Sequence, residues 1–337
     1  MTLKKRIFAA FAALTLLAGC GTTEYSTDFF AMNTVMRITG RGRAAQETVA
    51  AAEQAVNGLD RLLSRTREES EIWALNHAGG EWVEVSDDTL AVLTTALTVA
   101  GETGGAYDPT VAPLTDLWQI GTEDAHIPAA EDIAAARETV DYRNVELEGN
   151  RVRLQNGAQL DLGGVAKGWA GGNVLDPSSL TGALLELGGN VSCFGKKADG
   201  STAYTIGVAN PDDNSTYIAT VAVTDGCAVT TGDYERYFIE DGVRYHHVFD
   251  PATGYPADSG LRSVTVVMDY ADGGLADGYS TALFVMGLED GLAFCEAHGL
   301  AAAFVTADKT VYVTAALRGA FTFCGEEAGF ALADEMG

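Results

Sequence analysis

The order of helical and extended segments constrains the fold of this 337-residue chain more than any other feature. Apolar residues recur with a helical period over 44–63, which predicts a first helix. Residues 86–89 offer N-caps for a second helix, which Gly104 and Gly105 would end. Pro128 suits the first turn of a third helix. Residues 29–39 alternate enough to predict a strand before these helices.

Short strand patterns dominate from residue 145 onward, and two further helices are expected over 276–286 and 289–298. The predicted strands cover 145–147, 152–154, 159–162, 204–208, 218–223, 237–240, 243–249, 263–268, 304–306 and 311–314. These segments lack a regular β-α-β rhythm, so a doubly wound parallel sheet is disfavoured. We predict an α+β fold with mixed or antiparallel sheets flanked by helices.

The first 19 residues have the pattern of an export signal. Three basic residues, Lys4 to Arg6, precede an apolar run over 7–17 that is too short to span a bilayer. The sequence Leu-Ala-Gly-Cys, ending at Cys20, resembles the lipobox of bacterial lipoproteins. In such proteins cleavage precedes a cysteine whose thiol carries a diacylglycerol, and several acyl chains together give stable anchoring. The alternative is an ordinary secretory signal with an incidental cysteine.

This pattern divides the chain into three parts. We expect a lipoprotein signal peptide over 1–19, a polar tether over 20–28 that follows lipidated Cys20, and one functional domain over 29–337. The domain would lie on the extracytoplasmic face of the bacterial cell membrane, where cytosolic ATP is not available. This location is a prediction from the sequence pattern.

The composition excludes some partners and leaves the cysteine state open. The formal net charge of the chain is −26, and the predicted signal holds three Lys/Arg and no acidic residue, which leaves −29 after cleavage. Such a surface repels nucleic acid and anionic lipid headgroups. Four further cysteines, Cys193, Cys227, Cys295 and Cys324, have no CxxC spacing, so either disulfides or buried free thiols are possible.

Two glycine-rich segments could bring the backbone close to a phosphate or a metal ion. They are DLGGVAKG at 161–168 and LGGN at 187–190. Neither has Walker A or GxGxxG spacing, so tight turns are the alternative interpretation. A third segment, HVFDPATG at 247–254, places a histidine beside a turn, and histidine can accept a proton near neutral pH.

Asp277 and Thr281 stand at positions i and i+4 at the start of a predicted helix. Side chains at this spacing share one face of a helix. A carboxylate, a hydroxyl and a backbone carbonyl suit a hard cation such as Mg²⁺. The alternative is an aspartate that is favoured only by the helix dipole.

Taken together, these segments resemble the ApbE family, the FAD:protein FMN transferases, over nearly all of residues 30–317. The matching segments follow the family order and cover 32–34, 63–64, 70–72, 75–76, 105–111, 161–168, 186–190, 229–234, 247–254, 276–277 and 281. The resemblance implies Mg²⁺-dependent cleavage of FAD at its pyrophosphate. FMN would pass to a Thr or Ser hydroxyl of a partner flavoprotein in an extracytoplasmic electron-transfer system, and AMP would leave.

The resemblance also implies roles for individual residues. It assigns metal binding to the carbonyl of Gly164 and the side chains of Asp277 and Thr281, and proton abstraction from the acceptor to His247. The positions that match FAD contacts are Met32, Ala106, Tyr107, Asp108, Asp161 and Lys167. His246 is adjacent to His247, but neighbours in an extended segment face opposite sides, so only His247 is expected to face the site.

This chain departs from the family pattern at three places. Many family members have glycine where this chain has Asn33, and an aromatic residue, able to stack on the flavin, where it has Thr66. Tyr107 or another aromatic residue would have to supply that stacking. Lys167 matches a variable position. Residues 225–231 look faintly like a flavinylation motif, but they overlap a family segment, so we interpret them as structural.

Two other functions use the same residues. A lipoprotein that stores FAD would bind the dinucleotide without releasing AMP. An Mg²⁺-dependent FAD pyrophosphatase would release FMN and AMP without an acceptor.

Overall fold

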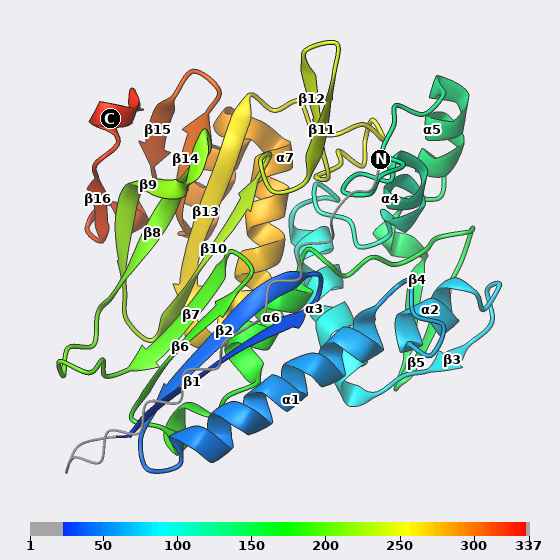
Figure 1. The fold of residues 1–337 in the computed structure, drawn as a ribbon. Helices are drawn as coiled ribbons and strands as arrows, with labels where there is room; N and C mark the ends of the chain where they lie inside the picture. The colour runs from blue at the N-terminus through cyan, green and yellow to red at the C-terminus, as the bar shows by residue number, and fades with distance from the viewer. Residues whose placement is uncertain (1–22, 335–337) are drawn as a thin grey trace, which may run out of the picture.

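A nine-stranded sheet runs through the centre of residues 23–334, which are the residues that the computed structural model describes (Figure 1). The predicted signal peptide and Cys20 lie outside them. Neighbouring strands are antiparallel except for the last pair, which is parallel. In spatial order the strands are β1 (Glu24–Ala31), β2 (Thr34–Arg41), β6 (Gly182–Leu187), β7 (Asn190–Gly195), β10 (Gly226–Gly232), β13 (Leu261–Asp269), β14 (Ala301–Thr306), β15 (Thr310–Val313) and β17 (Ala331–Leu332).

Three smaller sheets complete the strands of the described residues. One contains β16 (Phe321–Phe323), β9 (Asp213–Val223) and β8 (Tyr204–Asn210), in that order. The second contains β3 (Val83–Glu84), β5 (Arg151–Leu154) and β4 (Val145–Glu148). The third is the hairpin of β11 (Tyr237–Glu240) and β12 (Val243–His246), which stands above the central sheet in Figure 1.

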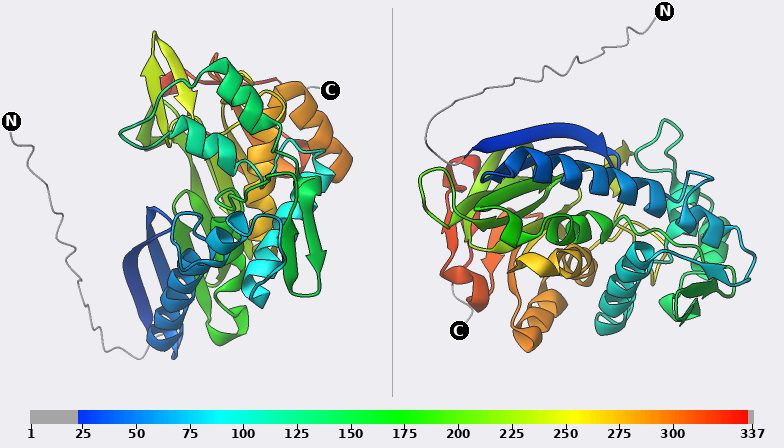
Figure 2. Two further views of the ribbon diagram at one scale, coloured as in Figure 1. Left: turned by 90° about the vertical axis from the view of Figure 1, so that its right-hand side faces the viewer. Right: turned by 90° about the horizontal axis from the view of Figure 1, so that it is seen from below.

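Helices and the small β8-β9-β16 sheet cover opposite faces of the central sheet (Figure 2). The α-helices are α1 (Ala45–Leu63), α2 (Glu71–Asn76), α3 (Asp87–Glu102), α4 (Ala112–Trp118), α5 (Ala130–Arg137), α6 (Ala166–Asn173), α7 (Gly273–His298) and α8 (Ala315–Arg318). Short 3₁₀ helices are η1 (Tyr142–Asn144), η2 (Pro177–Ser179), η3 (Tyr270–Asp272) and η4 (Glu326–Ala328). No helix within residues 23–334 is long and apolar enough to cross a membrane.

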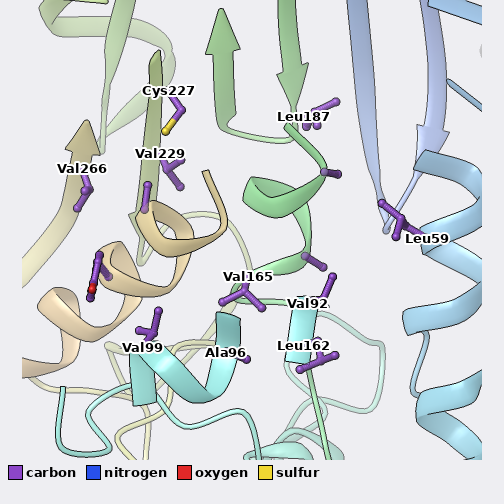
Figure 3. Close-up of a cluster of buried hydrophobic side chains, with 14 of the residues drawn as sticks. Leu59, Val92, Ala96, Val99, Leu162, Val165, Leu187, Cys227, Val229 and Val266 are labelled. Carbon is purple, nitrogen blue, oxygen red and sulfur yellow. The ribbon is translucent and has the colours of Figure 1, made fainter. Parts of the chain in front are cut away.

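The main core lies between the central sheet and α1, α3, α6 and α7. Figure 3 shows part of it, with Val99 of α3, Val165 before α6 and Val229 of β10 among the labelled side chains. Cys227 and Val229 face this core, whereas Ala228 between them faces the β8-β9-β16 sheet. Successive side chains of β10 therefore point to opposite faces of the central sheet, as in any extended strand.

Several predicted elements are confirmed. Helix α1 buries one face at the expected helical spacing, and α3 begins with Ser86, whose Oγ accepts a hydrogen bond from the N–H of Thr89. The two helices predicted after residue 276 form one element, α7, which is interrupted at Gly287 (φ 80°, ψ −174°). Cys193, Cys227, Cys295 and Cys324 are free thiols, and the first three are buried.

Other expectations were wrong in extent. Residues 24–28, predicted as part of a tether over 20–28, belong to β1, which begins at Glu24 and pairs with β2. The single strand predicted over 29–39 is a hairpin, which turns at Met32 (φ 47°) and Asn33 (φ 60°). The strand predicted over 159–162 makes only one bridge, between Gln159 and Val111.

Candidate functional site

Helices α6 and α7 approach so closely that no side chain fits between them at one point. A Cβ atom on Gly168 would lie 2.1 Å from the carbonyl oxygen of Gly273 and 2.6 Å from Cβ of Asp277. Atoms cannot approach each other to this distance, so Gly168 is required by packing. The contact lets the N–H of Gly168 donate a hydrogen bond of 2.9 Å to Oδ2 of Asp277. The glycine-rich segment over 161–168 therefore orients the carboxylate of α7.

The Asp277 carboxyl group is buried without an ion-pair partner among the described residues. Its side chain belongs to a residue that is 4% exposed, and no ion pair reaches it from the residues that the structure describes. Burial raises the pKa of Asp277, while the charge of Lys167, the Gly168 N–H and the Asn190 amide oppose this rise. A cation beside the carboxyl group would favour its charged form.

The structure brings together the three predicted metal ligands. A Cβ atom on Gly164 would lie 3.7 Å from Oγ1 of Thr281, so the loop before α6 faces the first turns of α7. Asp277 and Thr281 stand one turn apart on α7, as predicted. No cluster of three His, Cys, Asp or Glu residues able to hold a metal occurs within residues 23–334. A set with one carboxylate and two neutral oxygens suits Mg²⁺ that keeps waters or substrate phosphates.

The Tyr107 ring packs closely against Gly164. A Cβ atom on Gly164 would lie 2.8 Å from Cε2 of Tyr107, and the tyrosine is 4% exposed. Its buried hydroxyl has no hydrogen-bond partner within the described residues. Burial first, and then the charges of Asp161, Asp277 and Asp108, raise the pKa of Tyr107, so the phenol stays protonated and can donate. Its covered ring can present little surface for flavin stacking.

Asp108 acts mainly on its own loop. Its Oδ1 accepts hydrogen bonds from the N–H and Oγ1 of Thr110, at 2.8 and 2.6 Å, and its Oδ2 accepts one of 2.8 Å from the N–H of Tyr142. Burial raises the pKa of Asp108, and these hydrogen bonds oppose the rise. The carboxylate therefore fixes the loop that carries Ala106, which is half-buried, and Tyr107.

Asp161 and Lys167 border the glycine-rich loop. Oδ1 of Asp161 accepts a hydrogen bond of 2.9 Å from the N–H of Gly163, and Oδ2 lies 3.2 Å from Nε of Arg65. Nζ of Lys167 donates to the carbonyl of Gly163 at 3.1 Å. Arg65 was not among the residues predicted for the site, although it directly follows the family segment at Leu63 and Ser64. Both ends of the loop are thus held by charged groups.

Met32 and Thr66 lie on the α1 side. The N–H of Met32 donates a hydrogen bond of 2.9 Å to Oδ1 of Asp60, which holds the positive-φ turn against α1. Met32 itself is half-buried and packs on the core, and Thr66 is exposed. Asn33 adopts the left-handed conformation that glycine would adopt easily, as expected for asparagine.

His246 and His247 have different environments, in agreement with their opposite orientation. His246 is 5% exposed, its Nε2 is 3.0 Å from the carbonyl of Ala257, and its ring packs edge-on against Phe284. His247 is half-buried, and its Nδ1 is buried without a hydrogen-bond partner within the described residues. Burial, and then the charges of Arg236, His246 and Lys167, lower the pKa of His247 to about 3, so its imidazole is neutral.

Two buried polar atoms of this region, the Tyr107 hydroxyl and Nδ1 of His247, have no hydrogen-bond partner within the described residues. The Asn190 amide interacts with the Asp277 carboxyl group and opposes the rise of its pKa. Leaving a buried polar atom unpaired costs about 1–3 kcal/mol. Such a concentration of polar atoms without partners fits a site that binds a polar ligand and a cation. Asn190 begins β7 and belongs to the LGGN segment noted in the sequence.

A cavity of about 690 Å³ lies elsewhere, between α2 and β5. Its lining includes Asn76, Arg153 and Gln155 and none of the residues predicted to bind FAD or metal. The guanidinium of Arg153 is already paired with Glu146 and lies over the Trp82 ring. We assign the function to the Gly164–Asp277 region because the converging chemistry is there.

Comparison with known proteins identifies the family. The family model described as the ApbE family matches residues 32–304. The chain belongs to the ApbE family. It is 35% identical over 319 residues to a FAD:protein FMN transferase of Treponema pallidum, a match that covers 87% of this chain and 88% of that protein. A Klebsiella pneumoniae protein of the same name is 34% identical over 275 residues, covering 79% of this chain and 84% of that protein.

Solved ApbE structures share the fold. The crystal structure of the ApbE protein from Thermotoga maritima matches with a TM-score of 0.82 and 34% identity, over 88% of this chain and 98% of that chain. The flavin transferase ApbE from Vibrio cholerae matches with a TM-score of 0.78 and 28% identity, over 89% of this chain and 99% of that chain. The predicted α+β fold and the resemblance to ApbE proteins are confirmed.

Proposed function

We propose that this protein transfers FMN from FAD to a threonine or serine hydroxyl of a partner flavoprotein and releases AMP. The name of its relatives, FAD:protein FMN transferase, supports the reaction class. The observation that carries the proposal is the convergence of Gly164, Asp277 and Thr281 near a neutral, unpaired His247. The charge of Lys167 lowers the pKa of both Asp277 and His247, so the proposed metal ligands and the proposed base belong to one region.

In the proposed reaction, the acceptor hydroxyl oxygen attacks the phosphorus of the FMN half of FAD. A new P–O bond forms, the bond from that phosphorus to the bridging oxygen breaks, and AMP leaves with the bridging oxygen. The hydroxyl proton passes to the neutral imidazole of His247 and then to solvent. The energy comes from the phosphoanhydride of FAD, so no ATP is needed. Such a transfer requires mainly alignment and charge stabilisation.

Mg²⁺ would be held by the Gly164 carbonyl, the Asp277 carboxylate and the Thr281 hydroxyl. When bound, it would supply charge stabilisation to the pyrophosphate and to the leaving AMP. The protein's own groups would do the rest. The Tyr107 phenol would donate a hydrogen bond to the substrate, and Lys167 would add positive charge beside the phosphates. The Asp108 carboxylate would keep the loop of Ala106 and Tyr107 in place.

We also propose that the protein works on the extracytoplasmic face of the cell membrane, held by a lipid on Cys20. The lipobox-like sequence supports this location. The acceptor would then be a flavoprotein of a membrane or extracytoplasmic electron-transfer system. The strong negative charge of the chain argues against direct binding to anionic lipid headgroups, so the lipid would be the membrane attachment.

The decisive experiment is mass spectrometry of a candidate acceptor after incubation with the protein, FAD and Mg²⁺. We expect an acceptor mass increased by one FMN group, located on a Thr or Ser, with one AMP released per transfer. Omission of the acceptor separates the alternatives. AMP and free FMN formed at the same rate without acceptor would mean that the protein is a pyrophosphatase. FAD binding without any AMP would mean that it is a storage protein.

A further inference from the structure

Three hydroxyl groups form a continuous chain beside the candidate metal ligands. Oγ1 of Thr231, in β10, lies 2.7 Å from Oγ of Ser280 and 3.2 Å from Oγ1 of Thr281, both in α7. Oγ of Ser280 donates a hydrogen bond of 2.8 Å to the backbone carbonyl of Asp277. These hydrogen-bonded hydroxyl groups therefore link β10 of the central sheet to α7, the helix that carries two of the proposed ligands.

Each hydroxyl has a single hydrogen, and this limits the possible directions of the hydrogen bonds. The hydrogen of Ser280 is used by the Asp277 carbonyl, which has none to give. Thr231 must therefore donate to Ser280. Its only hydrogen is then used, so in the contact with Thr281 it must accept. Thr281 therefore donates its hydrogen toward Thr231.

The competing contact of Thr281 is weaker. Its Oγ1 lies 3.4 Å from the Asp277 carbonyl, which already accepts the shorter bond from Ser280. With its hydrogen directed to Thr231, the Thr281 oxygen offers only lone pairs on its remaining side. A cation requires this arrangement, because a hydroxyl hydrogen pointed at it would repel it.

We propose that Thr231 is a positioning residue that fixes the Thr281 hydroxyl as a metal ligand. Ser280, which is fully buried, holds Thr231 in the donating role. The inference rests on the proposed function, since it concerns the same metal site. It adds a hydrogen-bond partner for the proposed ligand Thr281, and this partner lies on β10, a strand that contributes no proposed ligand. Outer partners of this kind orient a ligand, and their loss commonly lowers metal affinity about 10–100-fold.

The neighbouring threonine of the same strand provides a matched control. Oγ1 of Thr230 lies 2.8 Å from Oγ1 of Thr265 in β13, so its hydroxyl is also paired with another hydroxyl. Adjacent residues of a strand point to opposite faces, so Thr230 faces away from α7. Thr230→Val removes the same chemical group at a neighbouring position and leaves the chain of Thr231, Ser280 and Thr281 intact.

The test is a titration of the purified protein with Mn²⁺, followed by electron paramagnetic resonance, with Mg²⁺ as competitor. Thr231→Val keeps the side-chain shape and removes the hydroxyl, and we expect its Mn²⁺ dissociation constant to rise about 10–100-fold. Thr231→Ser restores the hydroxyl and is expected to bind nearly as tightly as the wild type, as is Thr230→Val. Circular dichroism and thermal unfolding check that each variant is folded.

The outcomes separate this inference from the proposed function. Equal Mn²⁺ affinity of Thr231→Val and wild type, with loss of binding in Asp277→Ala, overturns the role of Thr231 and leaves the metal site in place. No saturable Mn²⁺ binding by the wild type overturns both. A similar loss in Thr231→Val and Thr230→Val would mean a general effect on β10, which also overturns the specific role. If Thr231→Val unfolds, Thr231→Ala and Ser280→Ala are measured in the same titration, and wild-type affinity in both overturns the inference.

Discussion

The backbone N–H of Gly168 donates a hydrogen bond of 2.9 Å to Oδ2 of Asp277, so that α6 orients the only carboxylate that we assign to the metal. This relationship explains why a glycine-rich loop and an aspartate more than one hundred residues later act together, and it makes Asp277 the most sensitive position of the proposed site.

Asp277→Ala is expected to lower FMN transfer by about 10²–10³-fold, because metal stabilisation of a transferring phosphoryl group supplies several kcal/mol. Thr281→Ala should have a smaller effect, since water can replace a neutral ligand. Single-turnover transfer at several Mg²⁺ concentrations measures both variants. Wild-type rates in Asp277→Ala at limiting Mg²⁺ would remove this residue from the metal site.

Asp277 also links stability to pH and to metal binding. Burial raises the pKa of Asp277, so above the ordinary aspartate pKa the folded protein binds more protons than the unfolded chain. The free energy of unfolding of the metal-free protein therefore falls as the pH rises through this window. We expect Asp277→Asn to raise the Tm of the metal-free protein at neutral pH.

The same experiment includes Mg²⁺. A ligand that binds only the folded state raises the Tm, so Mg²⁺ should stabilise the wild type and have no effect on Asp277→Asn. Differential scanning calorimetry with and without Mg²⁺, at acidic and neutral pH, gives both results. A metal-free Asp277→Asn that melts below the wild type at neutral pH contradicts the sign of this linkage.

Gly168→Ala should be strongly destabilising, because its Cβ would meet the Gly273 carbonyl oxygen at 2.1 Å and the two helices would have to separate. Overpacking of this kind costs about 1–3 kcal/mol or more. The control is Gly58→Ala in α1, where a Cβ would meet nothing within 4 Å. That change should stabilise the protein by about 0.5–1 kcal/mol. Urea unfolding compares the two, and similar effects would show that the α6–α7 contact is not restrictive.

His247→Ala is expected to retain FAD binding and to lose about 10²–10⁴-fold in transfer, the usual contribution of a general base. FAD affinity and single-turnover transfer are measured side by side. His246→Ala is not a suitable control, although His246 is expected to face away from the site, because His246 is buried and packs on Phe284. Its replacement should lower the Tm. Full transfer by His247→Ala would move the role of base to another group.

The pH dependence of His247 has a defined direction. Burial lowers the pKa of His247 from the ordinary 6.5 to about 3. In the ligand-free protein the ring should therefore be neutral at pH 6.5, where an ordinary histidine is half protonated. The phosphates of bound FAD would raise this pKa, because an anion stabilises the imidazolium. A nuclear magnetic resonance titration with and without FAD measures both values. An ordinary histidine pKa in the free protein would contradict the buried position.

Cys20→Ser tests the proposed anchor. We expect this variant to lose membrane retention, because the thiol that would carry the diacylglycerol is absent. Transfer by the purified domain should be unchanged, since residues 1–28 contain no residue predicted to bind FAD or metal or to take part in catalysis. Fractionation of cells that express each form provides the measurement, and retention of Cys20→Ser in the membrane fraction would contradict lipidation.

Much of the helical framework could be predicted from the sequence, because α1 and α3 carry a clear apolar period and α3 a serine N-cap. The central strands β6, β7 and β10 were missed. They are buried on both faces or rich in small residues, so alternation of polar and apolar residues is weak there. The hairpin at Met32 was also missed, because its turn uses two non-glycine residues with positive φ.

The candidate ligands were found because Asp277 and Thr281 share one helix and because the family motifs are local. The partners of these ligands come from distant parts of the chain. Neither Thr231 nor Asn190 has a local pattern that connects it with α7. Their proximity depends on the packing of α7 against β10 and α6, which no single segment encodes. The sequence likewise did not show that the Asp108 carboxylate would be used by its own loop.

With a lipid on Cys20, the early start of β1 would limit how far the Met32 turn can lie from the membrane. Glu24, the first residue of β1, comes four positions after Cys20, and four Cα–Cα steps can span at most about 14 Å. The strand itself, from Glu24 to Ala31 beside Met32, adds about 26 Å. With a lipid on Cys20, the Met32 turn would therefore lie within about 40 Å of the bilayer. If FAD is held at the Met32 turn, an acceptor anchored in the same membrane would have to reach it within that height.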